Sequence, residues 1–161
     1  MKIIRPKLYL FDVDGTLRWT TIPGQPCPYR PGEWRLMPRV CETLRRIDWG
    51  PEGAALGIAS NQDGVAESRL SEAMAHSMIV DTLKEAIGFL PVNCAIEICV
   101  CGAKSSCERR KPGAEMLNSA IRRFGVPPGE VLFVGDLESD RQAAFNAGVR
   151  FTWSWDFFGW R

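Results

Sequence analysis

Histidine is almost absent from this chain, and several other features that would mark a particular class of protein are weak or missing. The single histidine, His76, lies in an apolar stretch expected to be helical, where packing or surface exposure is favoured over catalysis. Lys and Arg number 20 against 19 Asp and Glu, so the net charge is only +1. A near-neutral net charge gives no indication of a surface that binds nucleic acid or an anionic membrane.

Long apolar runs are also missing. None approaches the roughly 20 residues that a membrane-spanning helix requires. The opening residues 1–4 are followed by Arg5, Pro6 and Lys7, which interrupts any signal-peptide core. We therefore expect a cytoplasmic protein with no membrane partner. In that compartment the six cysteines are expected to be thiols or metal ligands rather than disulfides.

The 161 residues suit one domain spanning 1–161, and no repeat or low-complexity segment divides it. Apolar runs predict strands over 8–11, 54–59, 95–100, 131–134 and 150–154, with helical apolar stripes between them. This alternation predicts an α/β fold, a Rossmann-like doubly wound parallel sheet with helices on both faces. Residues 18–38, with five prolines and two glycines, are expected to form an irregular loop. Pro112 is expected in the first turn of a helix, and Ser139 with Gln142 to form a capping box for the next one.

Polar side chains follow three of the predicted strands, where ligands bind in such sheets. Asp12 and Asp14 stand one residue apart after the first strand, and two carboxylates so close repel each other unless a cation or proton intervenes. One could attack phosphorus while the other moves the leaving-group proton. The alternative for an isolated pair of this kind is an ordinary Asp-Gly turn.

The other candidate residues are individually weaker. Ser60 and Asn61 could hold a phosphoryl oxygen, or could be a loop. Lys111, beside Arg110, could neutralise an anion at a helix start, or could belong to a solvated basic loop. Asp136 could complete an oxygen site for magnesium with Asp140 in support, or these could be carboxylates at a helix N-terminus.

Taken together, these segments resemble the haloacid dehalogenase superfamily over nearly the whole chain. The segments that carry the resemblance are Asp12-Val13-Asp14-Gly15-Thr16-Leu17, Ser60-Asn61, Lys111 and Gly135-Asp136 with Asp140. The resemblance implies a phosphatase in which Asp12 is the nucleophile that forms a phosphoaspartate and Asp14 is the acid and base. It also implies that Ser60 and Lys111 bind the phosphoryl group.

The same resemblance implies a Mg²⁺ cofactor held by Asp12, the Asp14 backbone carbonyl and Asp136. Ser60-Asn61-Gln62 and Arg110-Lys111-Pro112 resemble the capless subclass IIIA of that superfamily. That branch includes histidinol-phosphate phosphatases, heptose bisphosphate phosphatases and the polynucleotide 3′-phosphatase domain. It implies no separate cap domain, and it nominates Asn61 and Arg110 as substrate contacts.

This branch carries a zinc loop before Arg-Lys-Pro, patterned Cys-x-His…Cys-x-Cys. Here Cys99 and Cys107 match two positions, Cys101 replaces the histidine and can still bind zinc, and Arg109 replaces the last cysteine and cannot bind metal. Zn²⁺ is therefore left open: a fourth donor such as Cys94 or Cys27 completes the site, or the site is degraded. The alternative to a zinc site is that Cys99 and Cys101 serve only as small apolar residues at the end of a strand.

Two aromatic groups remain. The C-terminal group is expected to pack in the core rather than to form a binding platform, and consists of Trp153, Trp155, Phe157, Phe158 and Trp160. The other group follows the first predicted strand and is expected to overhang the site, where its aromatic and arginine side chains could grip a second phosphate or a nucleobase. It consists of Trp19, Tyr29, Arg30, Trp34 and Arg35.

The sequence thus predicts a Mg²⁺-dependent phosphomonoesterase acting on a small phosphorylated metabolite of the sugar phosphate, sugar bisphosphate or histidinol-phosphate type. We expect a monomer or small homo-oligomer. The alternatives are a polynucleotide 3′-phosphatase, a phosphotransferase between sugars, and a noncatalytic binding module that keeps the fold.

Overall fold

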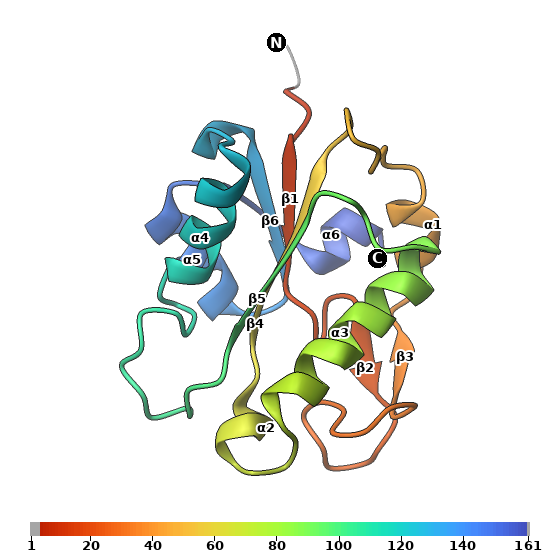
Figure 1. Ribbon diagram of the computed structural model, residues 1–161, viewed down its shortest axis with the longest axis vertical. Coiled ribbons are helices and arrows are strands. Elements are labelled where there is room, and N and C mark those ends of the chain that lie inside the picture. The colour runs from red at the N-terminus through yellow and green to blue at the C-terminus, as the bar shows by residue number, and fades with distance from the viewer. Residues whose placement is uncertain (1–3, 161) are drawn as a thin grey trace.

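A parallel five-stranded sheet forms the centre of the protein in a computed structural model that describes residues 4–160. Its strand order is β5-β4-β1-β6-β7, and every pairing is parallel (Figure 1). The strands of this sheet are β1 (Leu8–Phe11), β4 (Ala55–Asn61), β5 (Cys94–Cys99), β6 (Val131–Gly135) and β7 (Arg150–Trp153). The predicted fold class and strand positions are confirmed.

Helices cover both faces of this sheet. Two of them, α4 (Glu115–Phe124) and α5 (Glu138–Ala147), lie on one face, and α1 (Val40–Leu44), α3 (Glu72–Ile87) and α6 (Ser154–Phe158) lie on the other (Figure 1). Two short elements remain, α2 (Asp63–Ala66) and the 3₁₀ turn η1 (Pro128–Glu130). No helix within residues 4–160 is both long and apolar enough to cross a membrane.

Strand β1 contributes to two hydrophobic cores because its side chains alternate between the faces of the sheet. Leu8 and Leu10 pack in the core under α4 and α5, while Tyr9 and Phe11 face α1, α3 and α6. Phe11 and Leu10 are fully buried. This strand therefore places the residue that follows it, Asp12, at a rigid point in the middle of the sheet.

Phe157, Phe158 and Trp160 pack in the core around this central strand, as predicted, whereas Trp153 and Trp155 stack on each other at 4.6 Å. Phe158 is 1% exposed and its ring lies 6.4 Å from that of Phe11. Phe157 meets Phe11 edge-on at 5.7 Å, and Trp160 stacks on Phe158 at 5.5 Å. Phe157 and Phe158 belong to the helix α6, which the sequence did not predict, and Trp160 follows it.

The prediction of an irregular loop over 18–38 is wrong at its two ends. Strands β2 (Arg18–Thr20) and β3 (Trp34–Leu36) pair as an antiparallel hairpin, and the prolines between them are confined to its long connection. β-branched and aromatic residues favour strands, and the hairpin buries Arg18 and Trp34.

Two predicted helix starts are also wrong. Helix α4 begins at Glu115, not near Pro112, because a turn intervenes in which the Gly113 N–H donates to the Arg110 carbonyl. Helix α5 begins at Glu138, and its first turn is held by Asp140 rather than by Ser139 and Gln142.

Candidate active site

The carboxyl ends of β1, β4 and β6 bring the predicted residues that follow these strands to one edge of the sheet, where all of them except Asp136 line a single pocket. Asp12 and Asp14 follow β1, Ser60 and Asn61 end β4, and Asp136 follows β6. Because these strands are neighbours and parallel, all three ends lie at one edge, the lower edge in Figure 1. A pocket of about 310 Å³ opens there, lined by Asp12, Asp14, Pro26, Cys27, Ser60, Asn61, Asp63, Arg110, Lys111, Leu137, Ser139 and Asp140.

Lys111 lies at the centre of the charged network. Its Nζ donates to Asp12 Oδ1 at 2.7 Å and to Asp140 Oδ1 at 2.6 Å, and the residue is only 4% exposed. Burial by itself would lower the pKa of Lys111, but the two carboxylates outweigh it and raise that pKa above its usual value. Burial raises the pKa of Asp12, against the pull of Lys111. A buried carboxylate is thus held in a fixed orientation by a buried cation.

Asn61 fixes the backbone of Lys111. Its Nδ2 donates to the Lys111 carbonyl at 3.2 Å, and its Oδ1 accepts from the Lys111 N–H at 3.0 Å. Both ends of the amide therefore contact the lysine backbone, although Asn61 also lines the pocket. This pair joins the end of β4 to a segment 50 residues further along the chain.

Asp14 is held by two residues to which sequence reasoning gave no role. Arg18 Nε donates to Asp14 Oδ1 at 2.8 Å, and Gln62 Nε2 donates to Asp14 Oδ2 at 3.1 Å and to Ser60 Oγ at 2.6 Å. Arg18 is fully buried, and its Nη1 also donates to Thr82 Oγ1 in α3 at 2.9 Å. The Asp14 side chain is 16% exposed and lines the pocket. Only the distance of four residues between Asp14 and Arg18 could have suggested their ion pair.

Carboxylate oxygens of Asp12, Asp136 and Asp140 all lie within 4.8 Å of one another. Thr16 Oγ1 donates toward both Asp12 Oδ2 at 3.3 Å and Asp136 Oδ1 at 3.4 Å. Burial raises the pKa of Asp136, as expected for acids gathered away from water. A small, all-oxygen donor set of this kind suits Mg²⁺.

Asp140 holds the residues around this acidic group in place through its hydrogen bonds. Its Oδ1 accepts from Lys111, while its Oδ2 accepts the backbone N–H groups of Asp136 at 3.1 Å and Leu137 at 3.0 Å. The residue is 1% exposed. Asp140 is therefore placed to orient Lys111 and the start of α5.

Gly15 provides the space that Asp136 occupies. Its φ of +89° is a left-handed conformation that side-chain-bearing residues rarely adopt. A Cβ at this position would lie 2.3 Å from Asp136 Oδ2. The glycine thus lets the turn after β1 approach the carboxylate that follows β6.

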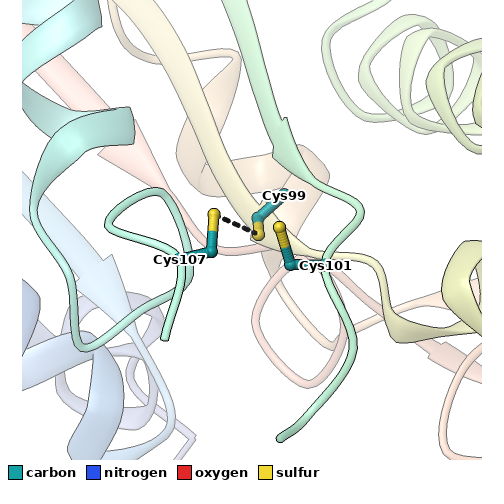
Figure 2. Close-up of side chains that lie close together, drawn as sticks. All are labelled: Cys99, Cys101 and Cys107. Carbon is teal, nitrogen blue, oxygen red and sulfur yellow. Dashed lines mark hydrogen bonds between the residues drawn. The ribbon is translucent and has the colours of Figure 1, made fainter. Parts of the chain in front are cut away.

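Three cysteines form a second cluster outside this pocket (Figure 2). The Sγ atoms of Cys99, Cys101 and Cys107 lie within 4.8 Å of one another, and those of Cys99 and Cys107 are 3.9 Å apart. A hydrogen bond with the Cys101 thiol helps lower the pKa of Cys107 to about 7, whereas burial raises that of Cys99 to about 11. The structure therefore brings together the three cysteine thiols that the sequence suggested as metal ligands.

The suggested fourth donors do not reach this cluster. Cys94 begins β5 and Cys99 ends it, while Cys27 lines the pocket beside Asp14. Arg109 turns away, because its Nη2 donates to Glu97 Oε2 at 2.8 Å and to the Ile98 carbonyl at 3.1 Å. Within residues 4–160, no further Cys, His, Asp or Glu side chain joins the three thiols.

The hairpin of β2 and β3 reaches the pocket through Pro26 and Cys27 in its connection. The residues expected to overhang the site do not line the pocket, and these are Trp19, Tyr29, Arg30, Trp34 and Arg35. Trp34 is buried, with the Arg18 guanidinium 5.4 Å from its ring centroid. Trp19 is half exposed. Burial, reinforced by Asp14, raises the pKa of Cys27 to about 12, so this pocket residue is an uncharged thiol at neutral pH.

Sequence and structure comparisons place these features among known proteins. The model of the haloacid dehalogenase-like hydrolase family matches residues 57–154. A D-glycero-beta-D-manno-heptose-1,7-bisphosphate 7-phosphatase from Bordetella bronchiseptica is 30% identical, covering 88% of this chain and 76% of that protein. A D-glycero-alpha-D-manno-heptose-1,7-bisphosphate 7-phosphatase from Campylobacter jejuni is 36% identical, covering 58% of this chain and 54% of that protein.

Solved structures agree with these relatives. The D,D-heptose 1,7-bisphosphate phosphatase of B. bronchiseptica, complexed with magnesium and phosphate, superposes with a TM-score of 0.74 at 27% identity. The match covers 90% of this chain and 78% of that one. With its central parallel sheet and the acidic pair after β1, the chain belongs to the haloacid dehalogenase-like hydrolase family.

Proposed function

We propose that this protein is a Mg²⁺-dependent phosphatase that hydrolyses the phosphate monoester of a small metabolite, of the sugar phosphate type. The observation that carries the proposal is the pocket in which Lys111 holds Asp12 while Arg18 and Gln62 hold Asp14. Two carboxylates with separate, fixed partners suit two separate roles in one reaction. The heptose bisphosphate phosphatases among its relatives support the substrate class.

In the proposed mechanism, Asp12 attacks phosphorus and the bond from phosphorus to the ester oxygen breaks. Asp14 gives its proton to the departing oxygen, which leaves a phosphoaspartate on Asp12. Asp14 then removes a proton from water, and the water oxygen attacks phosphorus and releases Asp12 and phosphate. Lys111 and Ser60 bind the phosphoryl oxygens throughout.

The acidic residues fit a magnesium ion, because their oxygens converge and Gly15 leaves Asp136 room to approach. Asp12, the Asp14 backbone carbonyl and Asp136 would hold it. When bound, the cation neutralises phosphate charge that would otherwise repel an attacking carboxylate. Asp140 supports the site by holding Lys111.

The direct test is phosphate release by the purified protein with Mg²⁺ and then with EDTA. Suitable substrates are heptose and hexose phosphates and bisphosphates, histidinol phosphate and a 3′-phosphorylated oligonucleotide. We expect Mg²⁺-dependent release from a sugar phosphate, abolished in Asp12→Asn without loss of the fold. Exclusive release from the oligonucleotide would favour the 3′-phosphatase alternative. Turnover by Asp12→Asn at the wild-type rate would refute the mechanism.

We further propose that Cys99, Cys101 and Cys107 hold a zinc ion with three protein ligands, the fourth position being taken by water or a small molecule. The support is the convergence of three sulfur atoms, the ligands that zinc favours. Metal analysis after zinc loading and dialysis should find about one zinc per chain, lost in Cys107→Ser. Cys94→Ser is the matched control. Equal zinc in all three proteins, or none in the wild type, would contradict the proposal.

A further inference from the structure

The wall of the pocket beyond the phosphate-binding residues decides which substrates fit. Once Asp12, Asp14, Ser60, Asn61, Lys111 and Asp140 are assigned to the reacting phosphate, six lining residues remain: Pro26, Cys27, Asp63, Arg110, Leu137 and Ser139. The leaving group of the substrate must lie against these side chains. Among them only Asp63 and Arg110 carry charge at neutral pH, since Cys27 stays protonated.

Arg110 and Asp63 neutralise each other. Arg110 Nη1 donates to Asp63 Oδ1 and Nη2 donates to Asp63 Oδ2 at 3.1 Å, so the pair is bidentate. The hydrogen bond and the charge of the Asp63 carboxylate raise the pKa of Arg110. Arg110 Nη1 also donates to the Cys101 carbonyl at 3.3 Å. This planar fork is the arrangement with which arginine otherwise grips a phosphate.

Lys111, the other cation of the pocket, cannot supply charge to a second phosphate. Its Nζ contacts Asp12 and Asp140 and serves the reacting phosphate. The pocket lining therefore has four carboxylates, Asp12, Asp14, Asp63 and Asp140, against two cations. A second dianionic phosphate in the leaving group would face no cation that lacks a carboxylate partner.

We infer that Asp63 is a specificity-determining residue that makes this pocket select substrates with a single phosphate and an uncharged hydroxylated leaving group. The inference rests on the proposed phosphatase activity. Some relatives are named for 1,7-bisphosphate substrates, so the inference assigns this chain a different substrate preference from theirs. The ion pair offers its outer hydrogen-bonding groups to hydroxyls, whereas an unpaired Arg110 would attract an anion.

The test compares kcat/KM for matched pairs, heptose 7-phosphate with heptose 1,7-bisphosphate and glucose 6-phosphate with glucose 1,6-bisphosphate. The wild type should prefer the monophosphate of each pair. Asp63→Asn keeps the side-chain shape but frees the charge of Arg110, so the ratio should move toward the bisphosphate by roughly 10-fold. Asp63→Ser should move it in the same direction.

Glu67→Gln is the matched control, because the substitution removes one negative charge, as Asp63→Asn does, at an exposed position four residues away. It should leave the ratio unchanged. A wild-type preference for bisphosphates, or an equal ratio in Asp63→Asn, would overturn the inference while the phosphatase activity stands. If no substrate is turned over, the proposed function fails. In that case, calorimetry measures how tightly Asp12→Asn binds the two substrates of each pair. Tighter binding of the monophosphate supports the inferred preference, and tighter binding of the bisphosphate overturns it.

Discussion

Replacing Arg18 by methionine should destabilise the protein and weaken its catalysis at the same time. Arg18 is fully buried, and its side chain donates to Asp14, to Thr82 and to the Met78 carbonyl. Removing one partner of a buried ion pair costs about 3–5 kcal/mol. Asp14 is 16% exposed and can be hydrated in the variant, so we expect a smaller loss than this, about 2–3 kcal/mol.

Urea unfolding followed by the fluorescence of the six tryptophans measures this loss. For a chain of this length it corresponds to a fall in Tm of roughly 5–10 °C. The matched control is Arg35→Met, the same substitution at an exposed position of the partner strand β3. It should change the free energy of unfolding by no more than about 0.5 kcal/mol.

The kinetic consequence of Arg18→Met separates a positioning role from a purely structural one. Loss of the contact with Asp14 should reduce kcat most for alkyl phosphates, whose leaving oxygens need a proton, and least for an aryl phosphate such as p-nitrophenyl phosphate. Arg18→Lys, which keeps the charge, should recover part of the stability. Equal unfolding midpoints for Arg18→Met and Arg35→Met, with equal kinetics, would refute the reasoning.

Further predictions concern the turn after β1, the pKa values of buried groups and the cation in the pocket. Gly15→Ala should drive Asp136 away and weaken Mg²⁺ activation at least about 10-fold, whereas Gly24→Ala, also at positive φ but with open space around it, should leave the Mg²⁺ titration unchanged. Burial raises the pKa of the partly buried Cys94 to about 11, whereas the unfolded thiol loses its proton near pH 9, so the free energy of unfolding should fall as pH rises from 9 toward 11. Cys94→Ala should show a shallower fall in urea titrations, and an identical slope would contradict this origin. Lys111→Met should lower kcat/KM by about 100-fold or more, since it removes the cation that contacts Asp12 and is proposed to bind the reacting phosphate, and a loss under about 3-fold would argue against that role.

The positions of the central strands could be predicted from sequence because each is a short apolar run ending in a turn. The edge of the sheet that carries Asp12, Ser60 and Asp136 followed from the parallel topology alone. The partners of Asp14 could not be predicted in this way. Arg18 reaches Met78 and Thr82 in α3, 60 and 64 residues further along the chain, and no local pattern encodes such contacts.

Local composition was misleading where tertiary packing decides the structure. The proline-rich stretch between Arg18 and Leu36 is the connection of a β-hairpin. The hairpin forms because burial of Trp34 and Arg18 in its strands outweighs the tendency of the prolines to form irregular structure. The aromatic run that forms α6 has a sequence suited to a strand, yet it coils so that Phe157 and Phe158 reach Phe11. Pro112 suggested a helix start, but its carbonyl accepts from Asn146 Nδ2 at 2.9 Å in a turn ahead of α4.

The central place of β1 in the sheet has a consequence for how the protein is made. Strand β6, a neighbour of β1, leaves the ribosome about 120 residues after β1, and the α6 rings that contact Phe11 come later still. Until those segments emerge, one edge of β1 lacks its partner strand and Phe11 lacks part of its packing. The acidic pocket can therefore form only after β6 and the start of α5 have been made, so a chain stalled before them would expose an unpaired strand edge without completing the site.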